Sequence, residues 1–203
     1  MNAELAPASR TAPVGEDLAY SFRPSLLGAG WAFRLTESGI EWVAGAKSGR
    51  IPYGKVRRIR MTYRPMSMQS HRFTTEVWAE GGQKLHIVST SWKSMVEQSR
   101  QDRPYTAFVG ELHRRIAEAG ATVRYEKGSN PFRYWPGLIA FTGLSLGLAA
   151  LIVRALQQGA MGGAAFVAAF LLLFLWQGGN FFRRNRPGSY SPEALPADLM
   201  PRA

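Results

Sequence analysis

The sequence predicts an α+β protein: an antiparallel β-barrel or β-sandwich capped by one C-terminal amphipathic helix and followed by a two-helix transmembrane hairpin. Three observations predict this class. Short segments of alternating polarity, separated by glycine-containing turns, run from residue 18 to residue 90. An apolar stripe with helical spacing follows in 103–119, and two long apolar segments occupy 136–157 and 160–177. Strands repeated about every ten residues are typical of antiparallel sandwiches and barrels.

The chain is expected to begin with a disordered leader at residues 1–16. This segment is rich in alanine, proline and small polar residues, and it lacks the basic and apolar regions of a secretory signal. Residues 17–127 then form one cytoplasmic, water-soluble domain, since about 110 residues suffice for one hydrophobic core. Its clearest hairpin signal is the sequence EGGQ at 80–83, which separates the strand-like segments 73–79 and 84–90.

A single amphipathic helix is predicted over 103–119. Asp102 is the expected N-cap, Pro104 fits the first turn, and Gly120 is a natural stop. The apolar stripe consists of Phe108, Val109, Leu112 and Ile116. Because this helix follows many strands, we expect it to cover the open side of a bent sheet. Residues 121–126 either add a last strand or lead to the membrane.

The two apolar segments are predicted to be transmembrane helices over 136–157 and 160–182, after a juxtamembrane linker at 128–135. As helices, the apolar segments would be about 33 Å and about 27 Å long, close to a hydrocarbon thickness of about 30 Å. A soluble domain of this size could not bury two helices that are apolar on every side. Only Gln158 and Gly159 separate the segments, so we expect a hairpin.

Positive charge predicts the orientation of this hairpin, because the connection between the spans is uncharged. The flanking basic residues are Arg124, Lys127 and Arg133 before the first span, and Arg183, Arg184 and Arg186 after the second. By the positive-inside rule both termini face the cytoplasm. Arg154, near the far end of the first span, is expected to snorkel toward the headgroups, with a buried functional charge as the alternative. The basic, proline-rich tail at 183–203 is expected to be unstructured or extended.

Glycines at four-residue spacing mark candidate packing faces on both spans. They are Gly143 and Gly147 on the first span, and Gly159 and Gly163 at the start of the second. Small residues at this spacing allow helices to approach each other closely. With so short a connection, the simplest partner is the other helix of the same hairpin. Homodimerisation or docking onto a larger membrane complex is the alternative.

A basic stretch is the strongest candidate for a binding surface, because residues 42–75 contain no Asp or Glu. If 56–64 is a strand, alternation divides its side chains between two faces. Arg58, Arg60, Thr62 and Arg64 then share one face, and Arg57, Ile59, Met61 and Tyr63 share the other. The candidate residues for binding anionic lipid headgroups or an acidic partner are Lys55, Arg57, Arg58, Arg60 and Arg64. The alternative is a solvated basic surface that only keeps the domain soluble.

Composition disfavours several other functions. The formal charge of +11 would suit nucleic acid, but part of it flanks the spans and no nucleic-acid motif is present, so no nucleic-acid partner is predicted. The chain has no cysteine, which excludes disulfides and thiolate chemistry. His71, His86 and His113 lack metal-ligand spacing and are expected at the surface or rim. We therefore predict no metal, no cofactor and no enzymatic activity. A membrane-tethered hydrolase would need a clustered polar pocket that the sequence does not indicate.

The order of these segments carries a family resemblance. Strands followed by one amphipathic helix, with LTESGIEW at 35–42 and GRIPYGKV at 49–56, resemble bacterial pleckstrin-homology-like (PH-like) domains. In those domains a strand, a turn and a second strand lead to an I-P-Y/F-x-x-V/I segment. Over residues 18–185 the chain resembles bacterial membrane proteins that join such a domain to two transmembrane helices. The resemblance does not imply a ligand. The basic residues at 55–60 lie on a later strand than the basic residues with which eukaryotic relatives bind phosphoinositides.

The resemblance implies a non-enzymatic module at the bacterial inner membrane. The predicted function is a scaffold or interaction protein whose basic strand surface binds anionic headgroups or an acidic protein partner. The alternative is an accessory subunit of a multi-subunit membrane complex, which would dock through its glycine-bearing helices and its proline-rich tail.

Overall fold

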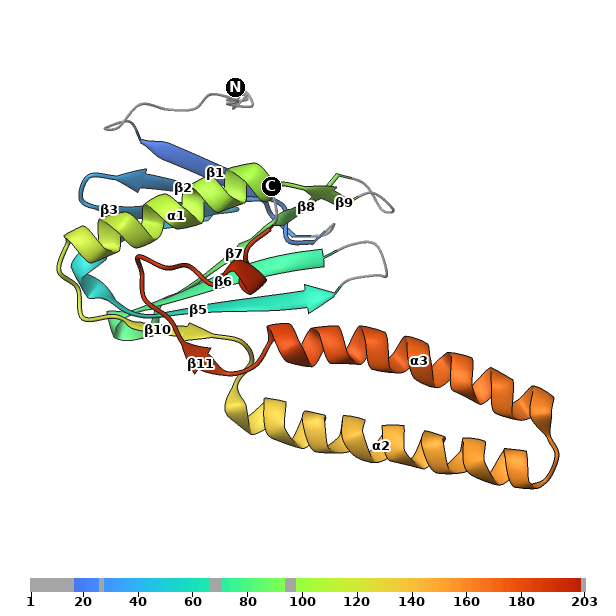
Figure 1. Ribbon diagram of the computed structural model, residues 1–203. Coiled ribbons are helices and arrows are strands. Elements are labelled where there is room, and N and C mark those ends of the chain that lie inside the picture. Colours follow the sequence, from blue (N-terminus) through green and yellow to red (C-terminus); the bar gives the residue numbers. More distant parts are fainter. Residues whose placement is uncertain (1–16, 26–27, 66–70, 94–97, 202–203) are drawn as a thin grey trace.

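The computed structural model describes residues 17–25, 28–65, 71–93 and 98–201. The leader predicted at 1–16 lies outside these residues. The described chain is an α+β protein, as predicted, in which a β domain with one covering helix precedes two long apolar helices (Figure 1). Its sheets are open at their edges, so the barrel form of the prediction is wrong.

The first sheet is an antiparallel meander of four strands: β1 (Leu18–Phe22), β2 (Trp31–Thr36), β3 (Gly39–Ala44) and β4 (Lys47–Pro52). Alternation directs one set of side chains inward, so Leu35 lies between Leu18 and Ile40 on the neighbouring strands. Pro52 ends β4, and the 3-10 turn Tyr53–Lys55 leads the chain into the second sheet. This change of sheet leaves β4 as an edge strand and prevents closure into a barrel.

The second sheet has the strand order β11-β10-β5-β6-β7. Its members are β5 (Val56–Pro65), β6 (His71–Ala79), β7 (Lys84–Val88), β10 (Arg124–Lys127) and β11 (Gly188–Ser189). β5, β6 and β7 form an antiparallel meander, β10 pairs with β5 in parallel, and β11 pairs with β10 antiparallel. Of the two alternatives for residues 121–126, the strand is therefore correct. A two-stranded ribbon, β8 (Thr90–Trp92) and β9 (Gln98–Arg100), follows β7.

The predicted amphipathic helix is α1 (Asp102–Glu118), and it packs against β1. The predicted stripe of Phe108, Val109, Leu112 and Ile116 is buried, together with Tyr105 and His113. Gly120 has a φ of +63°, the left-handed conformation that ends a helix. The prediction for Asp102 is wrong: Gln101 is the N-cap and its side chain makes no capping bond. Asp102 instead starts the helix and forms an ion pair with Arg100 at 2.5 Å.

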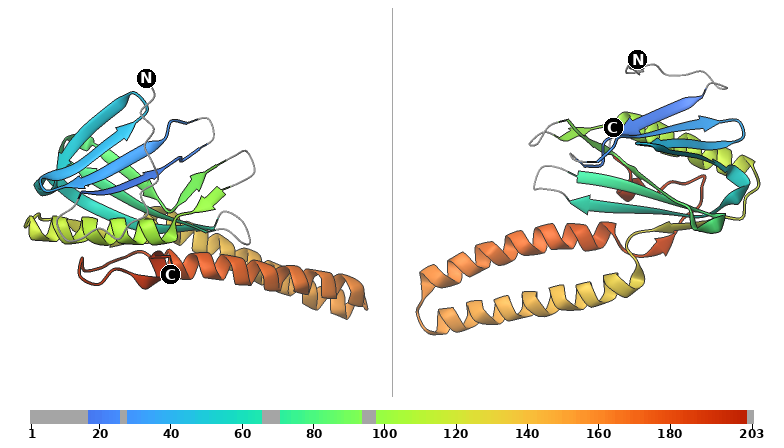
Figure 2. Two further views of the ribbon diagram at one scale, coloured as in Figure 1. Left: turned by 90° about the horizontal axis from the view of Figure 1, so that it is seen from above. Right: turned by 180° about the vertical axis from the view of Figure 1, so that it is seen from behind.

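The core lies between the two sheets and α1, and two hydrogen bonds involving buried tyrosines tie its elements together. The Tyr20 hydroxyl donates to the Val88 carbonyl at 2.6 Å, which ties β1 to β7. The hydroxyls of Tyr105 and Thr75 are 2.7 Å apart and join α1 to β6. Seen from above, α1 runs along one side of the sheets, whereas the two apolar helices extend beyond the end of the domain (Figure 2).

The apolar helices are α2 (Pro131–Gln157) and α3 (Met161–Arg184). α2 begins five residues before the predicted span, so most of the predicted linker at 128–135 is helical. The reason is an N-terminal signal that the hydropathy pattern did not reveal: the Asn130 side chain accepts a hydrogen bond from the backbone N–H of Phe132, and Pro131 occupies the first helical position. Most side chains of both helices are exposed, for example Leu172 at 69%, and Arg154 is exposed in the last turn of α2.

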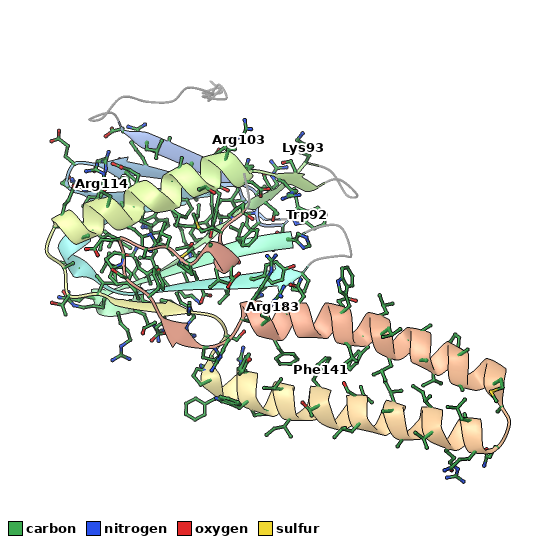
Figure 3. The ribbon with its side chains drawn as sticks, viewed as in Figure 1. Trp92, Lys93, Arg103, Arg114, Phe141 and Arg183 are labelled. Atoms are coloured by element: carbon green, nitrogen blue, oxygen red, sulfur yellow. The ribbon has the colours of Figure 1, made fainter. Side chains whose placement is uncertain are left out.

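Aromatic side chains, and not the predicted glycines, join α2 to α3. Phe141 points from α2 toward α3 (Figure 3), where an added Cβ at Gly178 would collide with its ring. By contrast, a Cβ built at any of the predicted packing positions would meet nothing within 4 Å: these are Gly143, Gly147, Gly159 and Gly163. The prediction that these glycines pack the hairpin onto itself is therefore wrong. Gly159 has a φ of +72° and serves the turn between the helices.

Candidate functional site

The predicted alternation along β5 is confirmed from Arg58 onward. Ile59, Met61 and Tyr63 are buried, and the side chains between them are partly or fully exposed. The prediction fails for Arg57, because the register shifts between Val56 and Arg58. Arg57 is exposed, and its Nε donates to Oε1 of Glu80 at 2.9 Å. It therefore does not share the buried face of β5.

Carboxylates from other strands neutralise the middle of the basic face. Arg60 pairs with Glu126, which lies directly beside it on β10, and the two side chains are only 15% and 19% exposed. On the other side of Arg60, Glu76 lies directly opposite it on β6 and accepts from Nζ of Lys84 at 2.7 Å. The face is therefore not a continuous basic surface, although the stretch 42–75 contains no acid of its own.

Trp78 occupies the end of this face that is farther from the apolar helices. The guanidinium of Arg58 lies 3.9 Å from the centre of the Trp78 ring, and Nζ of Lys84 lies 4.8 Å from it. Both cations are cross-strand neighbours of Trp78. Such cation–π contacts hold Arg58 against the sheet. Lys55 lies in the turn before β5 and is exposed.

Arg64 lies at the opposite end of β5, nearest the apolar helices, and is exposed. Among the described residues it forms no ion pair. Arg72 lies directly across from it on β6 and donates through Nε to the Thr90 hydroxyl at 2.9 Å. Burial lowers the pKa of Arg72, and the nearby charge of Arg64 lowers it further. Two neighbouring arginines without a carboxylate make this end of the sheet favourable for an anion.

Asn185, the residue after α3, joins the apolar helices to β5. Its side chain is fully buried and forms two hydrogen bonds with Tyr63: Oδ1 accepts from the backbone N–H at 3.0 Å, and Nδ2 donates to the backbone C=O at 2.8 Å. β10 pairs with β5 as far as Met61, so the Asn185 amide continues the ladder along the same edge. The Asn185 carbonyl also accepts from the N–H of Ser129 before α2. The side chain and backbone of this one residue thus link the sheet, the end of α3 and the segment that leads into α2.

A groove of about 670 Å³ lies between the outer face of the second sheet and the domain-side ends of α2 and α3. The sheet contributes Arg60, Thr62, Tyr63, Arg64, Pro65, Glu76, Trp78 and Lys84 to its lining. The helices and the residues beside them contribute Ser129, Asn130, Arg133, Tyr134, Gly137, Phe181, Phe182 and Asn185. The groove therefore brings the two predicted residues Arg60 and Arg64 together with helix residues that sequence reasoning did not connect to them.

The tail is not unstructured or extended, contrary to the prediction. After β11, it packs against the β domain, where Leu199 is 1% exposed within the main core. Tyr190 lies against the rings of His113 and Tyr125. Its hydroxyl and Nε2 of His113 are 2.7 Å apart, and Nδ1 of His113 is 2.7 Å from the Val109 carbonyl. His113 is therefore buried and not at the rim, which corrects the expectation for this residue. Residues that follow α3 therefore complete the hydrophobic core of the β domain.

The burial of His113 gives the fold a pH dependence. Burial lowers the pKa of His113 from 6.5 to about 4, although the hydrogen bond with Val109 acts in the opposite direction. Below pH 6.5 the unfolded chain therefore binds a proton that the folded chain does not, and stability falls as the pH falls toward 4. We expect a loss of about 2 kcal/mol between pH 7 and pH 5 from this residue.

Urea unfolding at both pH values tests this expectation. The His113→Gln variant should lack this part of the pH dependence, whereas His86→Gln, which changes a partly exposed histidine, should retain it. An equal loss of stability in the wild type and in His113→Gln would contradict the assignment.

Comparisons with known proteins add no relative. No protein family, no curated protein and no solved structure matches this chain. Within the described residues, α2 and α3 are both long and apolar enough to cross a membrane, which is compatible with a membrane protein. The same residues contain no group of three or more His, Cys, Asp or Glu side chains placed to hold a metal ion.

Proposed function

We propose that the protein is a non-enzymatic interaction module that crosses the bacterial inner membrane twice, with both termini in the cytoplasm. The exposed apolar surfaces of α2 and α3 support insertion in lipid, since the described chain does not cover them. Arg183 lies at the end of the hairpin next to the β domain (Figure 3). Arg133 lies in the first turn of α2, which begins at the same end. Their position supports a cytoplasmic location for the domain.

Site-directed labelling tests this topology, because the chain has no cysteine of its own. A cysteine introduced as Gln158→Cys, in the turn between the helices, should react with a membrane-impermeant maleimide in cells whose outer membrane is permeabilised. A Ser48→Cys variant, exposed on β4, should react only after the inner membrane is disrupted. The reverse pattern would overturn the proposed orientation.

The proposal includes a PH-like identity for the β domain. Nine strands precede α1: β1 to β4 in one sheet, β5 to β7 in the other, and the two-stranded ribbon of β8 and β9. This is the order of strands and helix that the resemblance in the sequence implies. β10 and β11 follow α1 and extend the second sheet beyond that order.

The direction of β5 is the observation that carries the proposed interaction with lipid. β5 runs toward the side on which α2 and α3 extend (Figures 1 and 2), and Asn185 fixes its end to α3. At about 3.3 Å per residue, Arg64 lies about 20 Å nearer to that side than Arg58 does. Electrostatic attraction to anionic lipid fades over about 8 Å at physiological ionic strength. Arg64 is therefore the member of the predicted set that can act on the leaflet.

Lipid enrichment around the full-length protein tests this function. Reconstituted in mixed phosphatidylglycerol and phosphatidylcholine bilayers and extracted as native nanodiscs, the wild type should retain an excess of phosphatidylglycerol. Each arginine near the surface contributes about 1 kcal/mol of attraction, so Arg64→Glu should reduce this excess strongly, as should high salt. The matched control is Arg57→Glu, which makes the same change of charge away from the proposed interface. Equal retention of phosphatidylglycerol by the wild type and Arg64→Glu would overturn the proposal.

A second function is favoured by the outward position of Gly143 and Gly147. Because neither glycine meets α3, their face is free to pack against another membrane protein, as expected for an accessory subunit. After extraction in a mild detergent, such a subunit should migrate with a larger complex, and Gly147→Leu should release it. Migration as a monomer before any substitution would exclude this function.

A further inference from the structure

The juxtamembrane groove changes character along its length. Toward the hairpin its lining is apolar, with Gly137 on α2 and Phe182 on α3. Toward the sheet it is polar and includes Arg64 on β5 and Arg133 in the first turns of α2. A surface that passes from aromatic to cationic where the helices leave the domain matches a phospholipid at the depth of its phosphate.

Charge compensation inside the groove leaves two cations available. Four cationic side chains line it, but Arg60 is paired with Glu126 and Lys84 is paired with Glu76. Arg64 and Arg133 are both exposed, and within the described part of the chain neither forms an ion pair. The groove therefore carries an unbalanced positive charge at its polar end, beside the sheet, which suits an anionic and not a zwitterionic headgroup.

The dimensions of the groove also fit such a ligand. A volume of about 670 Å³ lies within the range of about 300 to 1,000 Å³ that is usual for small-molecule sites. This is room for a headgroup, its glycerol and the adjoining part of the acyl chains. The groove is built from β5, α2 and α3 at once, and Asn185 holds these three elements together. It is therefore formed before any ligand binds.

We propose that this groove is a binding site for a single anionic phospholipid of the cytoplasmic leaflet. The phosphate lies between the guanidinium groups of Arg64 and Arg133, and the acyl chains leave past Gly137 and Phe182. This inference rests on the proposed function, because it requires α2 and α3 to be inserted in the membrane. It goes further in assigning a defined, saturable site in place of a general attraction to the leaflet.

The test uses the full-length protein in a neutral detergent, where no charged membrane surface is present. Titration with dioctanoyl phosphatidylglycerol should raise the apparent melting temperature to a plateau, and dioctanoyl phosphatidylcholine should not. Each of Arg64→Gln and Arg133→Gln should raise the half-saturating concentration about fivefold. Arg57→Gln, which removes a cation outside the groove, should leave it unchanged. A response that never saturates, or one that is equal for the two lipids, would overturn the site.

Two further experiments are needed. One distinguishes a phospholipid from a soluble phosphate ester, and the other distinguishes failure of the groove site from failure of the proposed function. Glycerol 3-phosphate, which has the phosphate without acyl chains, should give no plateau at the same concentrations. A plateau with this compound would overturn the lipid assignment in favour of a soluble phosphate ester. If bilayers still show phosphatidylglycerol enrichment while the detergent titration gives no plateau, the groove site is wrong and the proposed function stands. A plateau in detergent without enrichment in bilayers would instead support the site and overturn the general attraction to the leaflet.

Discussion

Replacing Asn185 with alanine is expected to lower the free energy of unfolding of the β domain by about 3 kcal/mol. The substitution removes both hydrogen bonds to Tyr63, whose backbone N–H and C=O then lack partners at a buried position. Leaving a buried polar group unsatisfied costs about 1 to 3 kcal/mol, and here two are affected. Urea unfolding of the full-length protein in detergent, followed by tryptophan fluorescence, measures the change. Hydrogen exchange at the Tyr63 amide should accelerate in parallel.

Two companion substitutions separate the hydrogen bonds from the bulk of the side chain. Asn185→Asp has nearly the same shape and keeps an acceptor for the Tyr63 N–H, but it cannot donate to the Tyr63 carbonyl in its ionised form and it buries a charge. It should destabilise the protein at least as much as Asn185→Ala. Arg186→Ala changes an exposed neighbour and should have little effect. A similar, small effect for all three variants would show that Asn185 does not hold β5 to the helices.

Patterns that repeat within one element predicted much of this fold. The alternation from Arg58 to Arg64, the apolar stripe of α1 and the two apolar helices all follow from local periodicity and hydropathy. Each depends on which side chains of a single helix or strand face the same way. The change of sheet at Pro52 and the start of α2 at Pro131 depend instead on turn and cap geometry. Their positions were less well predicted for that reason.

The candidate site could not be predicted in the same way, because its charges are balanced across strands that are distant in sequence. Residues 42–75 contain no acid, yet Arg60 pairs with Glu126 through the parallel register of β5 and β10. Nothing local to either residue indicates that register. The glycine spacing on α2 likewise does not reveal which side of the helix meets α3. Which charged residues or glycines share a surface can be stated only once the pairing of strands and helices that are distant in sequence is known.

The return of the tail to the core leads to the second large prediction. Leu199→Ala should lower the free energy of unfolding by about 3 kcal/mol, as expected for truncating a fully buried leucine. Leu199 is 1% exposed and belongs to the same core as the sheets and α1. Deleting residues 187–203 should destabilise the domain further. The deletion removes the cross-strand partners of Glu126 and Lys127 and the hydroxyl that is hydrogen-bonded to Nε2 of His113.

The contribution of the tail to the core also predicts the stability of a shortened chain. A fragment that ends at residue 127 keeps β1 to β10 but lacks Leu199, Tyr190 and the Asn185 amide, so it should be less stable than the full chain in the same detergent.

The matched control for Leu199→Ala is Ser191→Ala, which alters an exposed residue of the tail and should leave stability within about 0.5 kcal/mol of the wild type. If Leu199→Ala were as mild as this control, the tail would be lying on the domain without completing its core. Loss of stability in Leu199→Ala but not in Ser191→Ala would show that the segment after α3 folds as part of the β domain, which precedes α2 in the sequence.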